Sequence, residues 1–574
     1  MKPRFPVPPV FWLLLAALAL CVWMPPEIHT GSRLILAAVA ALLACLLVTA
    51  AAGKGMEGTP SPGGKWPVGG ASGGRIWALV IFTVGGLCAS SVLSLNPYRS
   101  HHLLTMLAGA CVFYLCCRCW TGRAPRIWIA SFLLISVLVA IVACLQAAGG
   151  LEHTLEAALE ADPELPVAWR ARLESGRVFG TLLLPATLGG LMGMALPVAV
   201  GFAVTLRGAG RMGALLAAGL LLAALALSRS YGAVGATALA VVWAAGRLPA
   251  RRALWLRIGV LAAALLAVLI FSSARYHSAS QHLLEPQGPV VQRWLNWKTA
   301  ASVVARYPVL GSGPGSYASA FVSLRQDGEN DTRYVHNTPL QAAAEAGVWI
   351  FLPLGIGLVR FYPRLSRALR ASPLEAGAAT GVVMFFVHNL VDFTAYLPST
   401  LWAALALAAI LPGAAGSGEE GFSRGTRLGV YAALAVVCVG SLGPVSRQWR
   451  GEILRDQARE AVRQPHAAQS ADPLYEAAVQ ADPSRADLHL EYARYLLDHE
   501  TNHPLRALEQ AEAAARQDRG SALAHSLMSN AWAARQEWAE AYVHAQAAVT
   551  IHPHSVQARA WLERLQEHLD AGHR

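Results

Sequence analysis

Charged residues are scarce in this chain. Only 14% of its 574 residues are Asp, Glu, Lys or Arg, whereas 55% are hydrophobic, and the mean hydropathy is +0.41. Apolar runs such as residues 34–52 approach the roughly 20 residues that cross a bilayer as a helix, which excludes a single soluble core. The strict alternation of a transmembrane barrel is also missing. The sequence therefore predicts an all-α, polytopic transmembrane helical bundle.

Cysteines are few and none lies in the long polar loop or the tail, so no disulfide framework is expected. Four of them cluster at Cys111, Cys116, Cys117 and Cys119. This cluster ends a predicted span and has no second set of ligands nearby, which favours small buried hydrophobic residues over a metal site. We expect no metal and no cofactor.

Windows of about 19 residues mark thirteen candidate spans, so we expect about 12–13 crossings. The candidate spans lie near residues 10–25, 34–52, 76–95, 101–119, 127–148, 178–205, 212–228, 232–246, 254–272, 346–362, 378–396, 399–415 and 427–443.

Basic residues in the short loops set the expected orientation. With a cytoplasmic N-terminus, the Arg clusters near 118–126, 207–211, 247–257 and 360–370 all fall inside, as the positive-inside rule requires. The long loop 273–345 and the tail then lie outside. In a bacterium with two membranes the protein would be a multi-pass protein of the inner membrane, with this loop and the tail in the periplasm.

Charge divides the chain into two parts. Residues 1–443 hold 32 Lys and Arg against 17 Asp and Glu, a balance of +15, while residues 444–574 hold 14 against 18, a balance of −4. Because the basic residues of the first part sit in short loops between apolar runs, they orient helices, and nucleic-acid binding is not expected. We expect a membrane domain over 1–443 and a soluble domain over 444–574.

The tail contains an internal repeat. Two segments align at an offset of 36 residues, which pairs His489 with His525, and two others align at an offset of 34. This pattern of helix pairs resembles tetratricopeptide repeats, which usually bind a protein partner on a concave surface. The alternative is a solvated helical cap.

Four polar clusters lie on the predicted outer side, where polar groups near a membrane are costly and often functional. Arg177 and Arg229 could simply extend to lipid headgroups, and His388 with Asp392 could pair within one helix. The glycine-rich turn 311–315 lacks a preceding strand and the Gly-Lys-Ser/Thr ending, so it is interpreted as a turn between helices. The clusters contain Arg177; Arg229; Arg293, His336, Asn337, Gln341 and Glu345; and His388 with Asp392.

Taken in order, these clusters resemble the bacterial O-antigen ligase and polymerase superfamily over about residues 170–412. Tyr231 departs from the family, which usually has Gly directly after its Ser-Arg pair, and the tail is absent from many members. The residues that carry the resemblance are Arg177/Gly180/Thr181, Ser228/Arg229, Arg293/Trp294, Pro308/Gly311/Gly313, His336/Asn337/Leu340/Gln341/Glu345/Gly347 and His388/Asp392/Phe393.

The resemblance implies transfer of a glycan from an undecaprenyl-diphosphate carrier to a hydroxyl acceptor during surface polysaccharide assembly. Arg293, with Arg177 and Arg229, would bind the diphosphate, because guanidinium groups bind phosphate oxygens bidentately. His336 would be the base for the acceptor hydroxyl. Residues expected to support the site or contact sugar are Asn337, Gln341, Glu345, His388 and Asp392.

Several functions stay open. The acceptor could be the lipid A core of lipopolysaccharide, another carrier-linked repeat unit of a polysaccharide, or a protein hydroxyl, the last being the reaction of a protein O-oligosaccharyltransferase. A transporter of polysaccharide or lipid-linked sugar with a scaffold tail is the main alternative from another class. It is disfavoured because acidic residues are nearly absent from the centres of the spans. A pure scaffold would not need the ordered Arg and His clusters.

Overall fold

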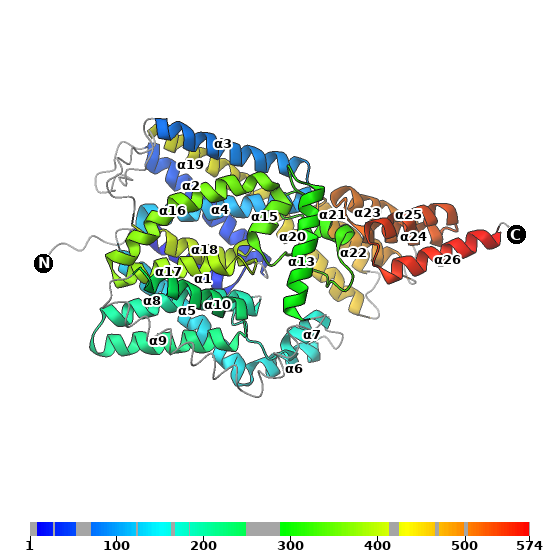
Figure 1. Ribbon diagram of the computed structural model, residues 1–574. Helices are drawn as coiled ribbons and strands as arrows, with labels where there is room; N and C mark the ends of the chain where they lie inside the picture. The colour runs from blue at the N-terminus through cyan, green and yellow to red at the C-terminus, as the bar shows by residue number, and fades with distance from the viewer. Residues whose placement is uncertain are drawn as a thin grey trace.

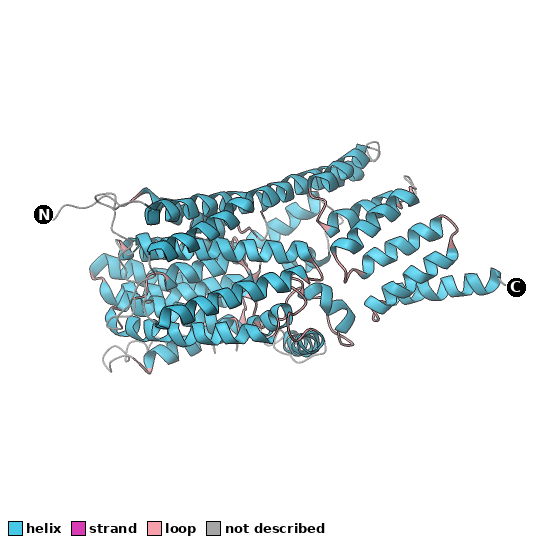
Figure 2. Ribbon diagram, turned by 90° about the horizontal axis from the view of Figure 1, so that it is seen from above, coloured by secondary structure: helices cyan, strands magenta, loops and turns pink. Residues whose placement is uncertain are grey.

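The computed structural model of the chain is built from helices, and no strand occurs in the residues it describes (Figures 1 and 2). This confirms the all-α prediction for that part of the chain. The described residues are 8–26, 29–52, 71–121, 124–161, 167–182, 184–247, 288–412, 424–464, 470–498 and 503–572.

Each predicted span in these ranges coincides with an apolar helix, while the span at 254–272 lies outside the described residues. Seven helical stretches are long and apolar enough to cross a membrane, and five shorter apolar helices accompany them in the part that is described. The apolar helices are α1 (Pro9–Trp23), α2 (Thr30–Ala52), α3 (Ala71–Val92), α4 (Pro97–Trp120), α5 (Pro125–Leu145), α8 (Pro185–Thr205), α9 (Gly208–Leu227), α10 (Tyr231–Ala245), α16 (Phe351–Ala371), α17 (Pro373–His388), α18 (Pro398–Ala408) and α19 (Arg424–Gly440).

Two predicted spans are too long because polar turns interrupt them. The span predicted over 178–205 becomes helical only at Pro185, after a turn in which Gly180 has a φ of +62°. The span predicted over 378–396 ends at His388, and a turn and the short 3₁₀ helix η5 (Thr394–Tyr396) follow. Both corrections place candidate site residues on irregular backbone at helix ends.

Glycine allows the two central helices, α8 and α17, to pack closely. A Cβ atom on Gly377 would lie 2.4 Å from the carbonyl oxygen of Pro197, and one on Gly381 would lie 2.5 Å from that of Met194. Gly201 on α8 faces the backbone oxygen of Pro373 at the start of α17 in the same way, at 2.6 Å, whereas Gly193 faces the side chains of Met384 on α17 and Thr237 on α10. Such small-residue contacts let the backbones of membrane helices approach each other.

The described elements between α10 and α16, which begin with α13 (Pro289–Arg306), lie with the tail at one end of the bundle, where α13 stands across the helix ends (Figure 1). The amide of Asn96 at the start of α4 donates to Asp518 of the tail, whereas Arg118 at the other end of α4 donates to the carbonyl oxygens of Ala409 and Leu411. The tail and the loop elements thus share the end opposite Arg118, which we call the site end.

The remaining elements build the site end and the tail. Residues 273–287 of the expected outer loop lie outside the described residues. These elements are η2 (Gln146–Gly150), α6 (Leu151–Ala161), α7 (Val167–Glu174), α13 (Pro289–Arg306), α14 (Tyr317–Leu324), α15 (Thr338–Ala346), η4 (Val348–Ile350), α20 (Leu442–Arg463), α21 (Ala471–Ala481), α22 (Ala486–Leu496), α23 (Pro504–Gln517), α24 (Ala522–Ala534), α25 (Trp538–Ile551) and α26 (Val556–Gly572).

Replacing Gly377 with Ala should destabilise the bundle by roughly 1–3 kcal/mol, because the new methyl group meets a backbone oxygen that cannot move aside. The melting temperature of the purified protein in detergent should fall. Gly235→Ala on α10 is the matched control, since its Cβ would meet nothing within 4 Å. Equal melting temperatures for the two variants would contradict this account of the packing.

Candidate active site

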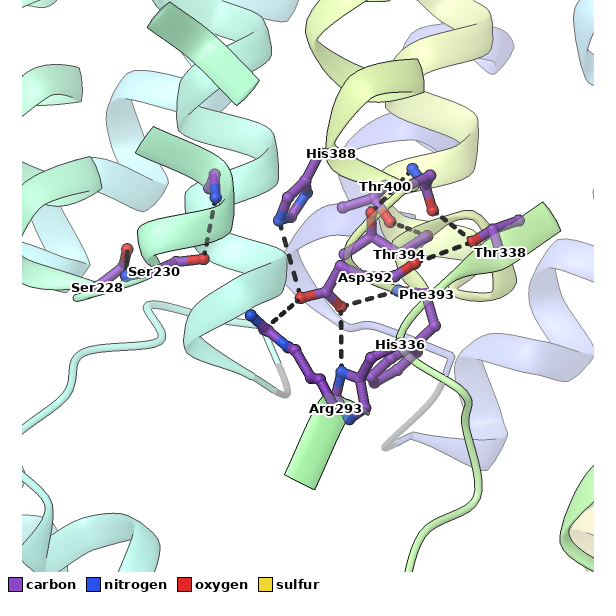
Figure 3. A network of polar contacts seen from close by, with 12 residues as sticks. Ser228, Ser230, Arg293, His336, Thr338, His388, Asp392, Phe393, Thr394 and Thr400 are labelled. Atoms are coloured by element: carbon purple, nitrogen blue, oxygen red, sulfur yellow. Dashed lines mark hydrogen bonds and ion pairs between the residues drawn. The ribbon is translucent and has the colours of Figure 1, made fainter. Parts of the chain in front are cut away.

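A fully buried carboxylate, that of Asp392, lies at the centre of the candidate site (Figure 3). One of its oxygens, Oδ2, is 3.4 Å from Nη2 of Arg293 and 3.8 Å from Nε2 of His388. The other, Oδ1, is 3.9 Å from Nδ1 of His336. A buried carboxylate needs such partners because an isolated charge in a low-dielectric interior is very costly. The structure therefore brings together four residues from two of the predicted clusters, Arg293 and His336 from the long loop and His388 and Asp392 from the later helix end.

The turn after α17 fixes the position of Asp392. The backbone N–H of Phe393 donates to Asp392 Oδ1 over 2.8 Å. The hydroxyl of Thr338 donates to Asn389 Oδ1 over 2.8 Å and to the backbone oxygen of Asp392 over 3.2 Å, and the N–H of Thr338 donates to the backbone oxygen of Asn389. Thr338 thus ties the start of α15 to the end of α17. Sequence reasoning missed it, although it directly follows the predicted His336-Asn337 pair.

His336 has an unusual backbone conformation, with a φ of +56°. A positive φ is strained for a residue with a side chain, and such strain persists where the surroundings enforce it. Here Trp297 Nε1 donates to the backbone oxygen of His336, and the imidazole packs edge-on against Phe393, whose ring stacks on Tyr334 at 4.0 Å. These contacts hold the ring toward Asp392.

The imidazole of His336 is suited to accept a proton. Burial lowers its pKa below the ordinary 6.5; Asp392 opposes this effect and Arg293 adds to it. The side chain is still 30% exposed, although Nδ1, on the side of Asp392, is itself buried and has no hydrogen-bond partner among the described residues. A neutral, partly accessible imidazole beside a guanidinium is the arrangement expected of a general base next to an anion-binding group.

His388 links the carboxylate to a neighbouring helical hairpin. Its side chain is fully buried, and among the described residues neither ring nitrogen has a hydrogen-bond partner. A Cβ on Gly190 of α8 would lie 3.3 Å from its Nδ1, and one on Gly232 of α10 would lie 3.7 Å from its Nε2. The ring therefore fills the space between α8 and the first turn of α10.

Arg177 and Arg229 tie two backbone segments together beside this turn, residues 175–177 and residues 228–229. Arg177 donates from Nε to the backbone oxygen of Ser228 over 3.2 Å and from Nη2 to that of Arg229 over 3.3 Å. Arg229, with a φ of +49°, donates from Nη1 to the backbone oxygen of Ser175. The two side chains thus place two guanidinium groups at the site end, anchored to protein carbonyl groups.

Three of the predicted residues, Asn337, Gln341 and Glu345, make contacts that stabilise the loop elements. The side chain of Asn337 caps α15 by accepting from the N–H of Leu340. Gln341 is 1% exposed and joins the N–H of Val335, the residue directly before the strained His336, to Glu345. The backbone contacts of both side chains, and the burial of Gln341, favour the supporting role over the sugar contact.

Glu345 organises the glycine-rich turn. Its buried carboxylate accepts from the N–H groups of Gly315 and Tyr317 and from the hydroxyl of Tyr396, at 2.9, 3.4 and 3.0 Å. Burial raises its pKa to about 6 against the effect of these hydrogen bonds. A Cβ on Gly311 would lie 2.2 Å from the backbone oxygen of Glu345, so the turn needs glycine for close packing. This agrees with the interpretation as a turn between helices.

A comparison with known families finds a match over part of this region. Residues 213–354 match the family model described as O-antigen ligase; within them, 248–287 lie outside the described residues. Comparisons with curated proteins and with solved structures found no match. The candidate residues inside the matched segment are Arg229, Arg293, His336, Asn337, Gln341 and Glu345. The match supports a membrane protein of the O-antigen ligase superfamily, with a glycan-transferring activity of the ligase or polymerase type.

Proposed function

We propose that this protein transfers a glycan from an undecaprenyl-diphosphate carrier to a hydroxyl acceptor. The observation that carries the proposal is the buried carboxylate of Asp392, which holds a guanidinium and an imidazole at one partly exposed site. The match to the O-antigen ligase family supports the same reaction class. The acceptor would be lipid A core, a carrier-linked polysaccharide unit, or a protein hydroxyl.

The site contains the groups that such a transfer needs. His336 would take the proton of the acceptor hydroxyl while its oxygen bonds to the anomeric carbon of the glycan. The bond from that carbon to the carrier phosphate breaks, and its electrons leave with the diphosphate. Arg293, with the Arg177–Arg229 pair, would neutralise the charge that develops there. Because cationic side chains and one base suffice for this step, we propose that it uses no metal or cofactor.

Asp392 would position Arg293 and stabilise the protonated form of His336. It holds Arg293 by a hydrogen bond of 3.4 Å and lies 3.9 Å from Nδ1 of His336, too far for a hydrogen bond to the neutral ring. Once His336 is protonated, the same carboxylate would stabilise the imidazolium as an ion pair. His388 would contribute by filling the space behind the carboxylate.

We place the reaction at the periplasmic face of the inner membrane. The site, the loop elements and the tail lie at the end of the bundle opposite Arg118, and the positive-inside rule favours cytoplasm for the Arg118 end. The antiparallel helices of the tail support the resemblance to tetratricopeptide repeats, and we propose a protein partner for them.

Arg293→Ala and His336→Ala should each lower the rate of glycan transfer by about 10²–10³-fold or more, because they remove charge stabilisation and the base. The test uses the purified protein in liposomes with undecaprenyl-diphosphate-linked glycan and candidate acceptors. Arg306→Ala, at the exposed end of the same helix, and His153→Ala, in exposed α6, serve as matched controls.

Normal transfer by both site variants would contradict the assignment of these residues. Movement of the lipid-linked glycan across the liposome membrane without transfer would favour the transporter instead. In cells that lack the gene and carry the variants, accumulation of single carrier-linked units would indicate a polymerase, and accumulation of full chains a ligase.

The transfer rate should fall in acid with an apparent pKa below 6.5, because only neutral His336 accepts a proton and burial lowers its pKa. Asp392 raises that pKa, so Asp392→Asn should shift the acidic limb of the kcat/KM profile to still lower pH, besides lowering the rate. An acidic limb that stays in place or moves up in this variant would mean that another group is the base.

A further inference from the structure

A short loop lies between the candidate site and the tail. We call residues 325–331, which follow α14, the latch loop. Its Glu329 side chain is 2% exposed and accepts from the hydroxyl of Thr299 on α13 over 2.6 Å. The side-chain amide of Asn296, in the orientation that satisfies its hydrogen bonds, donates to the other carboxylate oxygen over 2.8 Å. The latch loop is therefore bonded directly to the helix that carries Arg293.

A third residue of α13 extends this contact. Gln292 donates to the backbone oxygen of Gly328 over 2.9 Å and accepts from the N–H of Asn330 over 2.8 Å. Gln292, Asn296 and Thr299 are spaced by four and three residues, so they lie on one face of the helix. Arg293 is one position from Gln292, which turns it by about 100° toward Asp392. Rotation or displacement of α13 would move Arg293 away from the carboxylate.

The other side of the latch loop contacts the tail. Asp327 Oδ1 lies 2.7 Å from Nδ1 of His554, and Arg325 Nη1 lies 3.3 Å from Nε2 of His552. Both histidines belong to the turn between α25 and α26. The latch loop is therefore held between the tail and α13.

A second turn of the tail, between α23 and α24, contacts the site end through backbone groups. The N–H of Arg519 donates to the backbone oxygen of Leu95 over 3.0 Å. Gly520 lies so close to α14 that a Cβ there would be 2.2 Å from the backbone oxygen of Ser319. Because these contacts involve backbone atoms, they fix the distance between the tail and the site end.

These two turns belong to a series. The turn between α21 and α22 contains Asp482 and Arg485, which interact electrostatically with Tyr98 at the start of α4. The three turns, near 482–485, 518–521 and 552–555, are separated by about one repeat length, 34 to 36 residues. Equivalent turns of successive helix pairs therefore follow one edge of the tail, and two of them contact the elements of the site end directly.

We propose that the tail acts in cis as a clamp that positions Arg293 for the transfer reaction, with Glu329 as the positioning residue that connects the latch loop to α13. This inference rests on the proposed function and adds a role for the tail besides binding a protein partner. Arg293 makes its contact to Asp392 over 3.4 Å, so a small shift of α13 is enough to lose it.

Two variants of the full chain test the clamp from its two sides. Gly520→Ala adds a methyl group against Ser319, and Thr299→Val removes only the hydroxyl that donates to Glu329. Each should lower kcat for transfer roughly 10- to 100-fold, since a displacement of about 1 Å can cost 10²-fold. Gly443→Ala is the control for Gly520→Ala, because its Cβ would meet nothing within 4 Å.

Two further readouts separate positioning from general damage. Amide hydrogen exchange of α13 should accelerate in Gly520→Ala, although the substitution lies in the tail. In an Arg293→Lys background, Gly520→Ala should cost less than about threefold in kcat, because effects that act through one residue are not additive.

The outcomes are distinguishable from those that test the proposed function. If the wild-type protein transfers no glycan in liposomes, the proposed function fails. If the wild type is active and Arg293→Ala is inactive, but Gly520→Ala or Thr299→Val keeps wild-type kcat and exchange of α13, the clamp is overturned and the function stands. Should Gly520→Ala not accumulate in membranes, Thr299→Val alone decides by the same readouts.

Discussion

The buried carboxylate of Asp392 is the constraint on which the candidate site depends. A carboxylate with no exposed surface is tolerable only if hydrogen bonds and positive charge compensate for lost hydration. The compensation comes from three separate segments: the end of α17, the start of α13 and the strained turn at His336. The same need that stabilises the carboxylate therefore assembles a guanidinium and an imidazole beside it.

The membrane explains why these groups gather at helix ends. Irregular backbone and charged side chains are costly in hydrocarbon, so they are confined to protein interior or to the ends of the spans. The glycine contacts between α8 and α17 let these two helices pack closely. The polar residues lie outside both helices, in the turn that precedes α8 and in the turn that follows α17. A rigid apolar bundle thus presents Asp392 at its site end.

Hydropathy was sufficient to predict most of the bundle, because apolar length is a property of each segment alone. The candidate residues could also be found one cluster at a time. Their mutual contacts could not, since Arg293 and Asp392 are 99 residues apart in the chain. The roles of Gln341 and Glu345 could not be predicted either, because Gln and Glu occur both as buried supporting residues and as residues that bind substrate. Thr338 and Glu329 had no signal that distinguished them from ordinary loop residues.

The residues of the site belong to two different parts of the structure. Asp392 and His388 belong to the bundle, whereas Arg293 and His336 belong to the loop elements that lie across its end. Exposed ion pairs such as Asp327–His554 contribute little free energy, so they alone would hold the loop elements weakly. The backbone contacts of Arg519 and Gly520 carry no charge and do not titrate near neutral pH. A clamp built on them holds Arg293 through contacts that do not titrate, which separates the positioning of the site from its proton chemistry.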